Sequence, residues 1–328
     1  MFKIGIIGLG IISNSHFAAY ESLGRTKEIT AVCDINVENR AAEFAAKGIR
    51  TYTDYNKMLD SEEFDMVDIC LPTYLHKDAA IASLRHGFNT LVEKPMCLNA
   101  EEADEMIEAE KASKGRLMTA HVSRFKPQSL FLRRIIDSKE FGEPLYFRAW
   151  RFSSNPSKRF EDWLLDPKRG GGTIFDFQVH DIDLACWYLG NPVDFRSYKL
   201  AGNKDNELGS FISEMKFESG ATAVMEISHV MPDKYSFTSG MSMMFEKGEV
   251  ETSYRSDQEG WFTVSTEDSK KTYRYSELPV TYSRIPYGEE IGYFIDAIKD
   301  NKPFLISVEE SKLAVVASNK LVENGEMK

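Results

Sequence analysis

Residues 3–13 read KIGIIGLGIIS, a short apolar run that leads into two closely spaced glycines. The run predicts a strand, and Gly8-Leu9-Gly10 follows it directly and opens a helix, which is the context of a dinucleotide-binding loop. Gly8 allows the tight turn, and Gly10 lets the backbone approach a pyrophosphate at the positive end of the helix. Ser13 stands where the fingerprint has its third glycine, a packing position that tolerates a small residue. A glycine pair alone also fits a plain strand-to-helix turn.

The second predicted strand supports the nucleotide interpretation. EITAVCD (28–34) ends at Asp34, 24 residues beyond Gly10. An acid in this position accepts hydrogen bonds from the adenosine ribose. It also repels a 2′-phosphate, and the next residue, Ile35, offers such a phosphate no positive charge. NAD is therefore favoured over NADP as the cofactor.

Short apolar runs alternate with amphipathic stretches up to about residue 121. The predicted strands are 3–8, 28–34, 64–72, 89–95 and 116–121, and the predicted helices are 13–23, 37–47, 76–87 and 99–114. Strands separated by single helices form parallel βαβ units with helices on both faces of the sheet. We predict an α/β fold whose N-terminal domain, residues 1–121, contains a doubly wound parallel sheet.

The pattern changes after residue 121. Helices are expected at 127–138 and 174–189, strands at 145–154, 210–218, 221–230, 239–247, 248–255 and 260–267, and closing helices near 287–300 and 307–323. Strands joined by turn-like SG, KG and EG dipeptides, with no helices between them, are typical of an antiparallel sheet. Residues 122–328 are therefore predicted to form an α+β domain with a large, mostly antiparallel open sheet.

Composition limits the possible partners. The 40 basic and 51 acidic residues give a net charge of -11, and the basic residues form no long run, so nucleic acid and membranes are not expected as partners. No stretch approaches the roughly 18 apolar residues of a membrane span, and the apolar start lacks the basic leader of a signal peptide. The four cysteines show neither a pairable cluster nor a C-x-x-C motif. We expect a cytoplasmic protein with reduced thiols.

Two further segments follow predicted strands at the edge where doubly wound sheets bind ligands, LPTYLH (71–76) and VEKP (92–95). His76 either approaches the nicotinamide or only begins the next helix. Lys94 precedes a proline and is therefore held extended, so its side chain leaves the strand in a fixed direction; an exposed loop lysine is the alternative. The expected cofactor contacts are Gly8, Gly10, Ile11, Ile12, Asp34, Thr73, His76, Glu93 and Lys94.

The stretch RGGGTIFDFQVHDID (169–183) raises a second candidate. Steps of four and three residues place Asp176, His180 and Asp183 on one face of an α-helix. Asp176 and His180 alone are too few ligands for a metal ion, and no third ligand lies nearby in sequence, so no metal site is expected. Asp183 is given a supporting part only. Trp163 either stacks on a sugar ring or belongs to the core.

These residues together resemble the glucose-fructose oxidoreductase, inositol dehydrogenase and rhizopine-catabolism (Gfo/Idh/MocA) family of NAD(P)-dependent oxidoreductases. The resemblance spans nearly the whole chain. It rests on the Gly-Leu-Gly loop, Asp34, PTYLH, Glu93-Lys94-Pro95, Arg124-Phe125-Lys126-Pro127 and the 170–183 segment. It implies a Rossmann domain followed by an α/β domain whose open sheet often makes oligomer contacts, so we expect a homo-oligomer, a dimer or tetramer, formed through the C-terminal sheet.

The resemblance also implies roles for individual residues. In the family, the lysine at the Lys94 position binds the reacting oxygen, and the histidine at the His180 position commonly accepts the proton. The aspartate at the Asp176 position contacts the substrate or orients that histidine. We therefore expect Lys94, Asp176 and His180 to be catalytic and to contact the substrate. Trp163 is a further candidate for substrate contact, because sugar rings often lie on aromatic faces.

Elementary chemistry is consistent with these roles. Oxidising a secondary alcohol removes a hydroxyl proton while hydride leaves the same carbon, so a base must reach the oxygen and a cation must stabilise the developing alkoxide. Histidine suits the first role and lysine the second. The expected activity is NAD-dependent oxidation of a polyol, cyclitol or sugar. An NAD-dependent glycosidase that acts by transient oxidation and a non-catalytic nucleotide-sensing regulator are the alternatives; Lys94 and His180 argue against the regulator, but nothing excludes the glycosidase.

Overall fold

The computed structural model describes residues 2–154, 162–202, 208–279 and 285–327. Contacts divide the chain into two compact units. Unit 1 comprises Met1–Val122 and Ser283–Lys312, and unit 2 comprises Ser123–Tyr282 and Leu313–Lys328. The chain thus returns to the first unit late in the sequence, in a segment that the sequence prediction places in the second domain.

Unit 1 is built on a six-stranded parallel sheet in the order β3-β2-β1-β4-β5-β6. Its strands are β1 (Ile4–Ile7), β2 (Ile29–Cys33), β3 (Arg50–Tyr52), β4 (Met66–Ile69), β5 (Asn89–Glu93) and β6 (Leu117–Ala120). This order confirms the predicted doubly wound sheet. The strand order reverses between β1 and β4, and sheets of this kind bind ligands beyond the carboxyl ends of the strands at that point.

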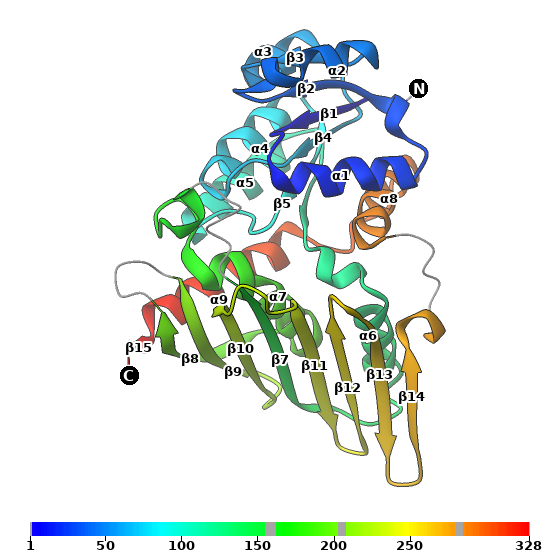
Figure 1. Ribbon diagram of the computed structural model, residues 1–328, viewed down its shortest axis with the longest axis vertical. Coiled ribbons are helices and arrows are strands. Elements are labelled where there is room, and N and C mark those ends of the chain that lie inside the picture. The colour runs from blue at the N-terminus through cyan, green and yellow to red at the C-terminus, as the bar shows by residue number, and fades with distance from the viewer. Residues whose placement is uncertain (1, 155–161, 203–207, 280–284, 328) are drawn as a thin grey trace. The chain divides into compact units, whose positions relative to one another are not determined.

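Helices cover both faces of this sheet, as the complete burial of β1, β4 and β6 requires. They are α1 (Ile11–Ser22), α2 (Ala41–Ala46), α3 (Tyr55–Ser61), α4 (His76–Arg85), α5 (Ala100–Ala112) and α8 (Pro286–Lys299). Helix α1 packs against α8, and α4 packs against α5 (Figure 1). Asn99 caps α5 by accepting a hydrogen bond of 2.8 Å from the backbone N–H of Glu102. The sequence prediction missed β3 and α3, which are both short.

Unit 2 contains a nine-stranded sheet among the described residues, in the order β14-β13-β12-β11-β7-β10-β9-β8-β15. The strands are β7 (Pro144–Ser154), β8 (Pro192–Gly202), β9 (Gly209–Phe217), β10 (Thr222–Met231), β11 (Thr238–Phe245), β12 (Gly248–Arg255), β13 (Gln258–Thr266), β14 (Lys270–Arg274) and β15 (Gly325–Met327). Neighbours are antiparallel except for the β7–β10 and β8–β15 pairs. The predicted mostly antiparallel sheet is confirmed, although β8, β14 and β15 were not predicted.

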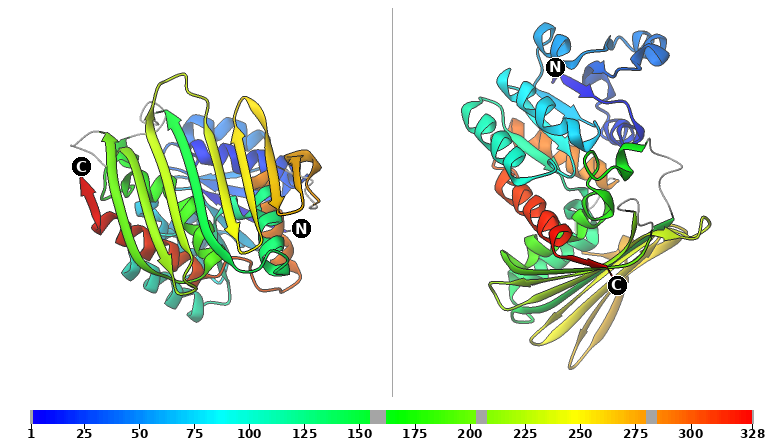
Figure 2. Two further views of the ribbon diagram at one scale, coloured as in Figure 1. Left: turned by 90° about the horizontal axis from the view of Figure 1, so that it is seen from below. Right: turned by 90° about the vertical axis from the view of Figure 1, so that its left-hand side faces the viewer.

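The core of unit 2 lies between one face of this sheet and the helices α6 (Pro127–Ser138), α7 (Val179–Leu189) and α9 (Val308–Glu323) (Figure 2). Alternation along β7 shows the two faces: Phe147 and Ala149 are buried in the core, while Arg148 and Trp150 lie on the opposite face. Whether that second face forms the expected oligomer contact stays a prediction.

Two smaller expectations concern the whole chain. The four cysteines are buried, and none forms a disulfide. No helix in the described part of the chain has the length and apolar character that crossing a membrane requires.

Candidate functional site

The glycine loop of unit 1 has the geometry of an anion-binding turn. Gly8 has a φ of +94°, and a Cβ there would lie 2.6 Å from the Cys70 carbonyl oxygen, so this position requires glycine. A Cβ at Gly10 would meet nothing within 4 Å, because the backbone faces open space. Gly10 precedes α1, whose first turn contains no acidic residue and receives no side-chain cap. The N–H groups of this turn are thus available to a phosphate, with the exposed Ile11 beside them.

Asp34 is fixed against this loop by two backbone hydrogen bonds. Its Oδ2 accepts the N–H of Leu9 at 2.8 Å, and its Oδ1 accepts the N–H of Asn36 at 2.8 Å. Each carboxylate oxygen keeps a lone pair for a further donor such as a ribose hydroxyl. Ser13 is completely buried and donates to the Gly10 carbonyl at 2.7 Å, which fits its predicted packing role.

The loop after β4 presents Thr73 and His76, both buried. Nδ1 of His76 lies 2.8 Å from the Pro95 carbonyl oxygen, and Nε2 lies 2.8 Å from that of Leu71. The ring therefore connects this loop to the turn that follows β5, and His76 is the first residue of α4. This arrangement fits the prediction that His76 begins the next helix. Its contact with the cofactor stays a prediction.

The end of β5 carries Glu93 and Lys94. Glu93 is buried, and its Oε2 accepts the backbone N–H of Lys94 at 3.0 Å. Lys94 is half-buried and is joined to Pro95 by a cis peptide bond. The glycine loop, Asp34, Thr73 and Lys94 all follow parallel strands of one sheet and so lie at its carboxyl edge. These groups suit a dinucleotide: donors for the pyrophosphate, a carboxylate for the ribose and a cation at the end of β5.

In unit 2, the glycines of the 169–183 stretch shape the chain before the helix. Gly171 and Gly172 have φ angles of +74° and +73°, which side chains other than glycine rarely adopt. A Cβ on Gly170 would lie 2.7 Å from the Leu164 carbonyl oxygen. The glycine at position 170 therefore lets the loop pack closely on its own backbone. The packed segment includes Trp163, which is half-buried in a short 3₁₀ turn.

The helix that follows is not uniform. Residues Ile174–Gln178 form a π-helical turn, and α7 begins only at Val179, so Asp176 and His180 are on different types of helical turn. Both side chains are half-buried. Asp183 is completely buried and receives two hydrogen bonds from Arg124, at 2.7 and 2.9 Å. Asp183 therefore lies in the interior, and the π turn alters the α-helical spacing on which the predicted common face of Asp176, His180 and Asp183 relied.

His229 lies outside the motifs that the sequence analysis identified, yet it is a neighbour of Asp176. His229 is buried on β10, with Nε2 at 3.9 Å from Oδ2 of Asp176 and its ring edge-on to Phe177 at a centroid distance of 4.0 Å. The two residues are far apart in sequence, and no motif links them. They line one small hollow with Leu164, Gly172, Thr173 and Leu208.

Comparison with known proteins identifies the family. A model of the Gfo/Idh/MocA oxidoreductase family with an NAD-binding Rossmann fold matches residues 2–121, and a model of the family's C-terminal domain matches residues 130–251. The chain belongs to the Gfo/Idh/MocA family. The resemblance in the sequence is thereby confirmed.

Individual relatives of this Gfo/Idh/MocA protein are dehydrogenases. The chain is 26% identical over 322 residues to myo-inositol 2-dehydrogenase of Thermotoga maritima, covering 96% of this chain and 93% of the relative. It is 31% identical over 228 residues to an NADP-dependent scyllo-inositol 2-dehydrogenase of Bacillus subtilis, covering 67% and 68%. Its fold matches a levoglucosan dehydrogenase solved with NADH and levoglucosan, at a TM-score of 0.83 and 20% identity over 98% and 96% of the two chains.

The Arg124-Phe125-Lys126-Pro127 motif borders another cavity of unit 2, and Lys126 is one of the residues that line it. Burial, and next the charge of Arg151, lower the pKa of Lys126 to about 7. Arg151 is itself paired with Asp181 at 2.7 Å, and both line this cavity with Lys126. Nothing in the spacing of the sequence indicated that this half-buried lysine lines a cavity.

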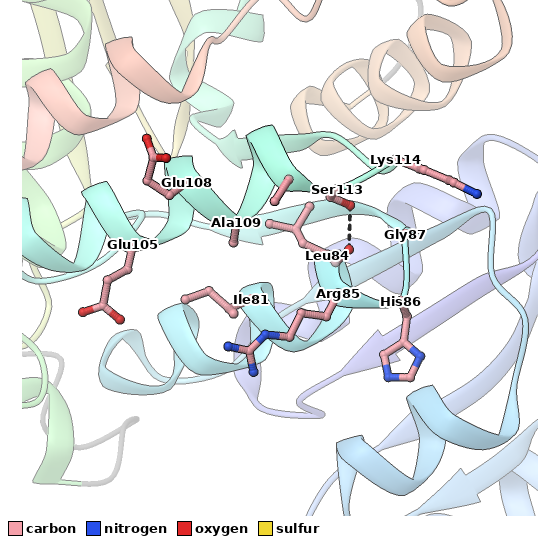
Figure 3. Close-up of a pocket in the computed structure, with 11 residues that line it drawn as sticks. Ile81, Leu84, Arg85, His86, Gly87, Glu105, Glu108, Ala109, Ser113 and Lys114 are labelled. Atoms are coloured by element: carbon pink, nitrogen blue, oxygen red, sulfur yellow. Dashed lines mark hydrogen bonds between the residues drawn. The ribbon is translucent and has the colours of Figure 1, made fainter.

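A surface groove of unit 1 lies away from all predicted site residues of this family member. It runs between the C-terminal ends of α4 and α5, and the Ser113 hydroxyl donates to the Leu84 carbonyl across it at 2.5 Å (Figure 3). Strands β5 and β6 begin just after these helix ends, so the groove is at the amino edge of the sheet. Ligands of such sheets bind at the opposite edge.

Proposed function

We propose that this chain is an NAD-dependent dehydrogenase that oxidises a secondary alcohol of a polyol, cyclitol or sugar. The observation that carries the proposal is the position of Lys94 at the end of β5, at the same sheet edge as the glycine loop and Asp34. The relatives named as inositol dehydrogenases support the substrate class, as does the levoglucosan dehydrogenase with the same fold.

The residues divide the chemistry between them. Bound nicotinamide would supply the hydride acceptor. Lys94 would bind the alcohol oxygen and stabilise the negative charge that develops there, and His180 would accept the hydroxyl proton. Asp176 would orient the substrate or His180, with His229 beside its carboxylate. In the reverse direction, the imidazolium of His180 would return the proton as a carbonyl is reduced.

Asp34 supports NAD as the preferred cofactor. Its carboxylate is fixed at the loop by Leu9 and Asn36, where it can accept ribose hydroxyls and repel a 2′-phosphate. The exposed Ile35 beside it offers no charge that could bind a phosphate. One relative is named as NADP-dependent, so preference differs among relatives and must be measured for this chain.

A substrate panel tests the proposal. Purified protein is incubated with NAD or NADP and with cyclitols (myo-, scyllo- and chiro-inositol), aldoses, sugar acids, levoglucosan and aryl glycosides. Absorbance at the NADH band and release of the aglycone are followed in parallel. We expect NADH formation with at least one cyclitol, polyol or sugar, and faster turnover with NAD than with NADP.

The control is the Lys94→Met variant, which removes the charge and keeps most of the length of the side chain. Glycoside cleavage without accumulation of NADH would replace the proposal with the hydrolase alternative. Binding of NAD with neither reaction across the panel would favour a nucleotide-sensing protein.

A further inference from the structure

His16 is a completely buried histidine to which the proposed chemistry gives no role. It lies on α1, with Nδ1 at 2.8 Å from Oδ2 of Asp68 and Nε2 at 2.9 Å from Oε1 of Glu93. Both carboxylates are buried as well. Two such short contacts need a proton in each, so the three side chains together hold two protons.

The surroundings favour an imidazolium between two carboxylates. Burial alone would lower the pKa of His16, but the Asp68 carboxylate and Cys70 together raise it well above its ordinary value. From α1 itself, Tyr20 donates to Oδ2 of Asp68 at 2.8 Å. The packed helix α8 brings the Tyr287 ring to 5.5 Å from the His16 ring, and it also carries the buried Glu290.

His16, Asp68 and Cys70 lie close enough together to hold a metal ion, but the distances from the His16 ring to Asp68 and Glu93 fit direct hydrogen bonds. Ligand atoms about 2.0–2.3 Å from a tetrahedral metal ion are separated by more than about 3 Å. Here nitrogen and oxygen are 2.8 and 2.9 Å apart. Burial and the neighbouring Asp68 raise the pKa of the Cys70 thiol to about 12, so it is protonated and a poor ligand.

The hydrogen bonds continue from His16 to Lys94. One oxygen of Glu93 binds the His16 ring, and the other accepts the backbone N–H of Lys94. The chain Asp68–His16–Glu93–Lys94 thereby ties α1, β4 and β5 to the point at which the Lys94 side chain leaves the strand.

We propose that His16 is a positioning residue for Lys94, acting through Glu93. This inference rests on the proposed function, in which Lys94 binds the reacting oxygen. A displacement of about 1 Å in such a group is enough to reduce turnover strongly, because the reacting atoms must be held at near-contact distance. His16 therefore affects the rate of the reaction without touching substrate or cofactor.

Two matched variants separate this role from a general contribution to stability. In His16→Asn the amide nitrogen takes the place of Nδ1 and keeps the bond to Asp68, while in His16→Gln it takes the place of Nε2 and keeps the bond to Glu93. Each variant removes one of the two hydrogen bonds of His16 and the positive charge of its ring. We expect kcat of His16→Asn to fall at least tenfold, kcat of His16→Gln to fall no more than about threefold, and NAD affinity to change less than threefold in both. His86→Gln, at the exposed residue that ends α4, is the control and should match the wild type.

The assay uses NAD and the alcohol with the highest turnover in the panel. Equal kcat values for the Asn and Gln variants, with equal losses of thermal stability, would show that His16 is only structural. The double variant His16→Asn/Lys94→Met gives a second test. We expect its kcat to equal that of Lys94→Met alone, because His16 acts through Lys94. If Lys94→Met alone keeps full turnover, the proposed function fails; if Lys94→Met loses turnover and His16→Asn does not, only the inference fails.

The protonation state of His16 gives a test that does not depend on turnover. Nitrogen NMR of the histidine side chains should show one residue with protons on both ring nitrogens above pH 7.5, absent from His16→Gln. Because the pKa of His16 is raised on folding, its stabilisation is complete below the unfolded value of about 6.5 and is lost as pH rises through the folded value. The free energy of unfolding of the wild type relative to His16→Gln should therefore fall as pH rises above about 6.5. A neutral ring at pH 7.5 with no such pH trend would overturn the inference.

Discussion

The two units hold their candidate residues in different ways. In unit 1, each candidate group follows a parallel strand and is fixed by hydrogen bonds of its own: Asp34 to the glycine loop, His76 to two carbonyls and Glu93 to Lys94. In unit 2, Asp176 and His180 lie where a π turn passes into α7. Helix α7 itself is anchored by two buried ion pairs, Asp181 with Arg151 and Asp183 with Arg124. Precise placement in unit 2 thus depends on buried charge rather than on strand geometry.

The largest effect is expected from breaking one of these buried pairs. Asp183→Asn replaces the carboxylate that binds Arg124 at 2.7 and 2.9 Å in a completely buried position. Removing one partner of a buried ion pair costs about 3–5 kcal/mol, because the remaining charge stays desolvated. We expect a loss of this size in the free energy of unfolding, measured by urea titration.

A matched control is available on the exposed face of the unit 2 sheet. Glu226 receives bonds from Arg148 at 2.9 and 3.3 Å, and both side chains are partly exposed. Glu226→Gln should cost no more than about 1 kcal/mol. If the two substitutions cost the same, the contrast drawn between the units is wrong.

The next effect tests the proposed chemistry of Lys94 and His180. Lys94→Ala and His180→Ala should each reduce kcat at least about a hundredfold, equivalent to about 2.7 kcal/mol, because one stabilises the alkoxide and the other removes the proton. NAD affinity, measured by calorimetry, should remain largely intact in both variants.

Asp176→Asn is a useful comparison, since it keeps the shape of a side chain that the proposal gives an orienting role. Full turnover in either alanine variant would remove the proposed mechanism. If NAD affinity falls by the same factor as kcat, the substituted residue binds the cofactor instead.

A smaller effect concerns cofactor choice in unit 1. Asp34→Ala removes the carboxylate that would bind the ribose and repel a 2′-phosphate, so we expect NAD binding to weaken and the ratio of kcat/KM for NADP to that for NAD to rise about tenfold. Because Asp34 also accepts the Leu9 N–H, Asp34→Asn is the control that keeps an acceptor at the loop. An unchanged cofactor ratio in both variants would show that Asp34 does not contact the ribose.

The sequence was sufficient for most of the fold. Short apolar runs predicted β1, β2, β4, β5 and β6 because a buried parallel strand is apolar on both faces. Strands β8 and β14 were missed because they are only partly buried, and β15 because three residues carry too little pattern. The return of α8 to unit 1 could not be predicted either, because the pattern of an amphipathic helix does not specify which unit it packs against.

The site was predictable only where the chain itself brings residues together. Gly8, Asp34 and Lys94 were located by their place after strands, since strand ends of one sheet meet at one edge. The hydrogen bonds of His16 with Asp68 and Glu93 join residues 52 and 77 positions apart, and no local pattern reports them. Asp176 and His180 were found by spacing, but spacing assumes an α-helix and could not predict the π turn between them.

The smallest predicted effect sharpens the description of the glycine loop. Ser13→Gly restores the third glycine of the fingerprint but removes the hydrogen bond to the Gly10 carbonyl and adds a flexible residue inside α1. We expect the free energy of unfolding to fall by about 0.5–1 kcal/mol and NAD affinity to change less than threefold, because Ser13 is buried away from the loop surface. Ser15→Gly on the same helix should cost a similar stability and leave affinity unchanged. A more than tenfold gain in NAD affinity for Ser13→Gly would mean that the serine obstructs the cofactor, and that unit 1 is less preformed than its hydrogen bonds indicate.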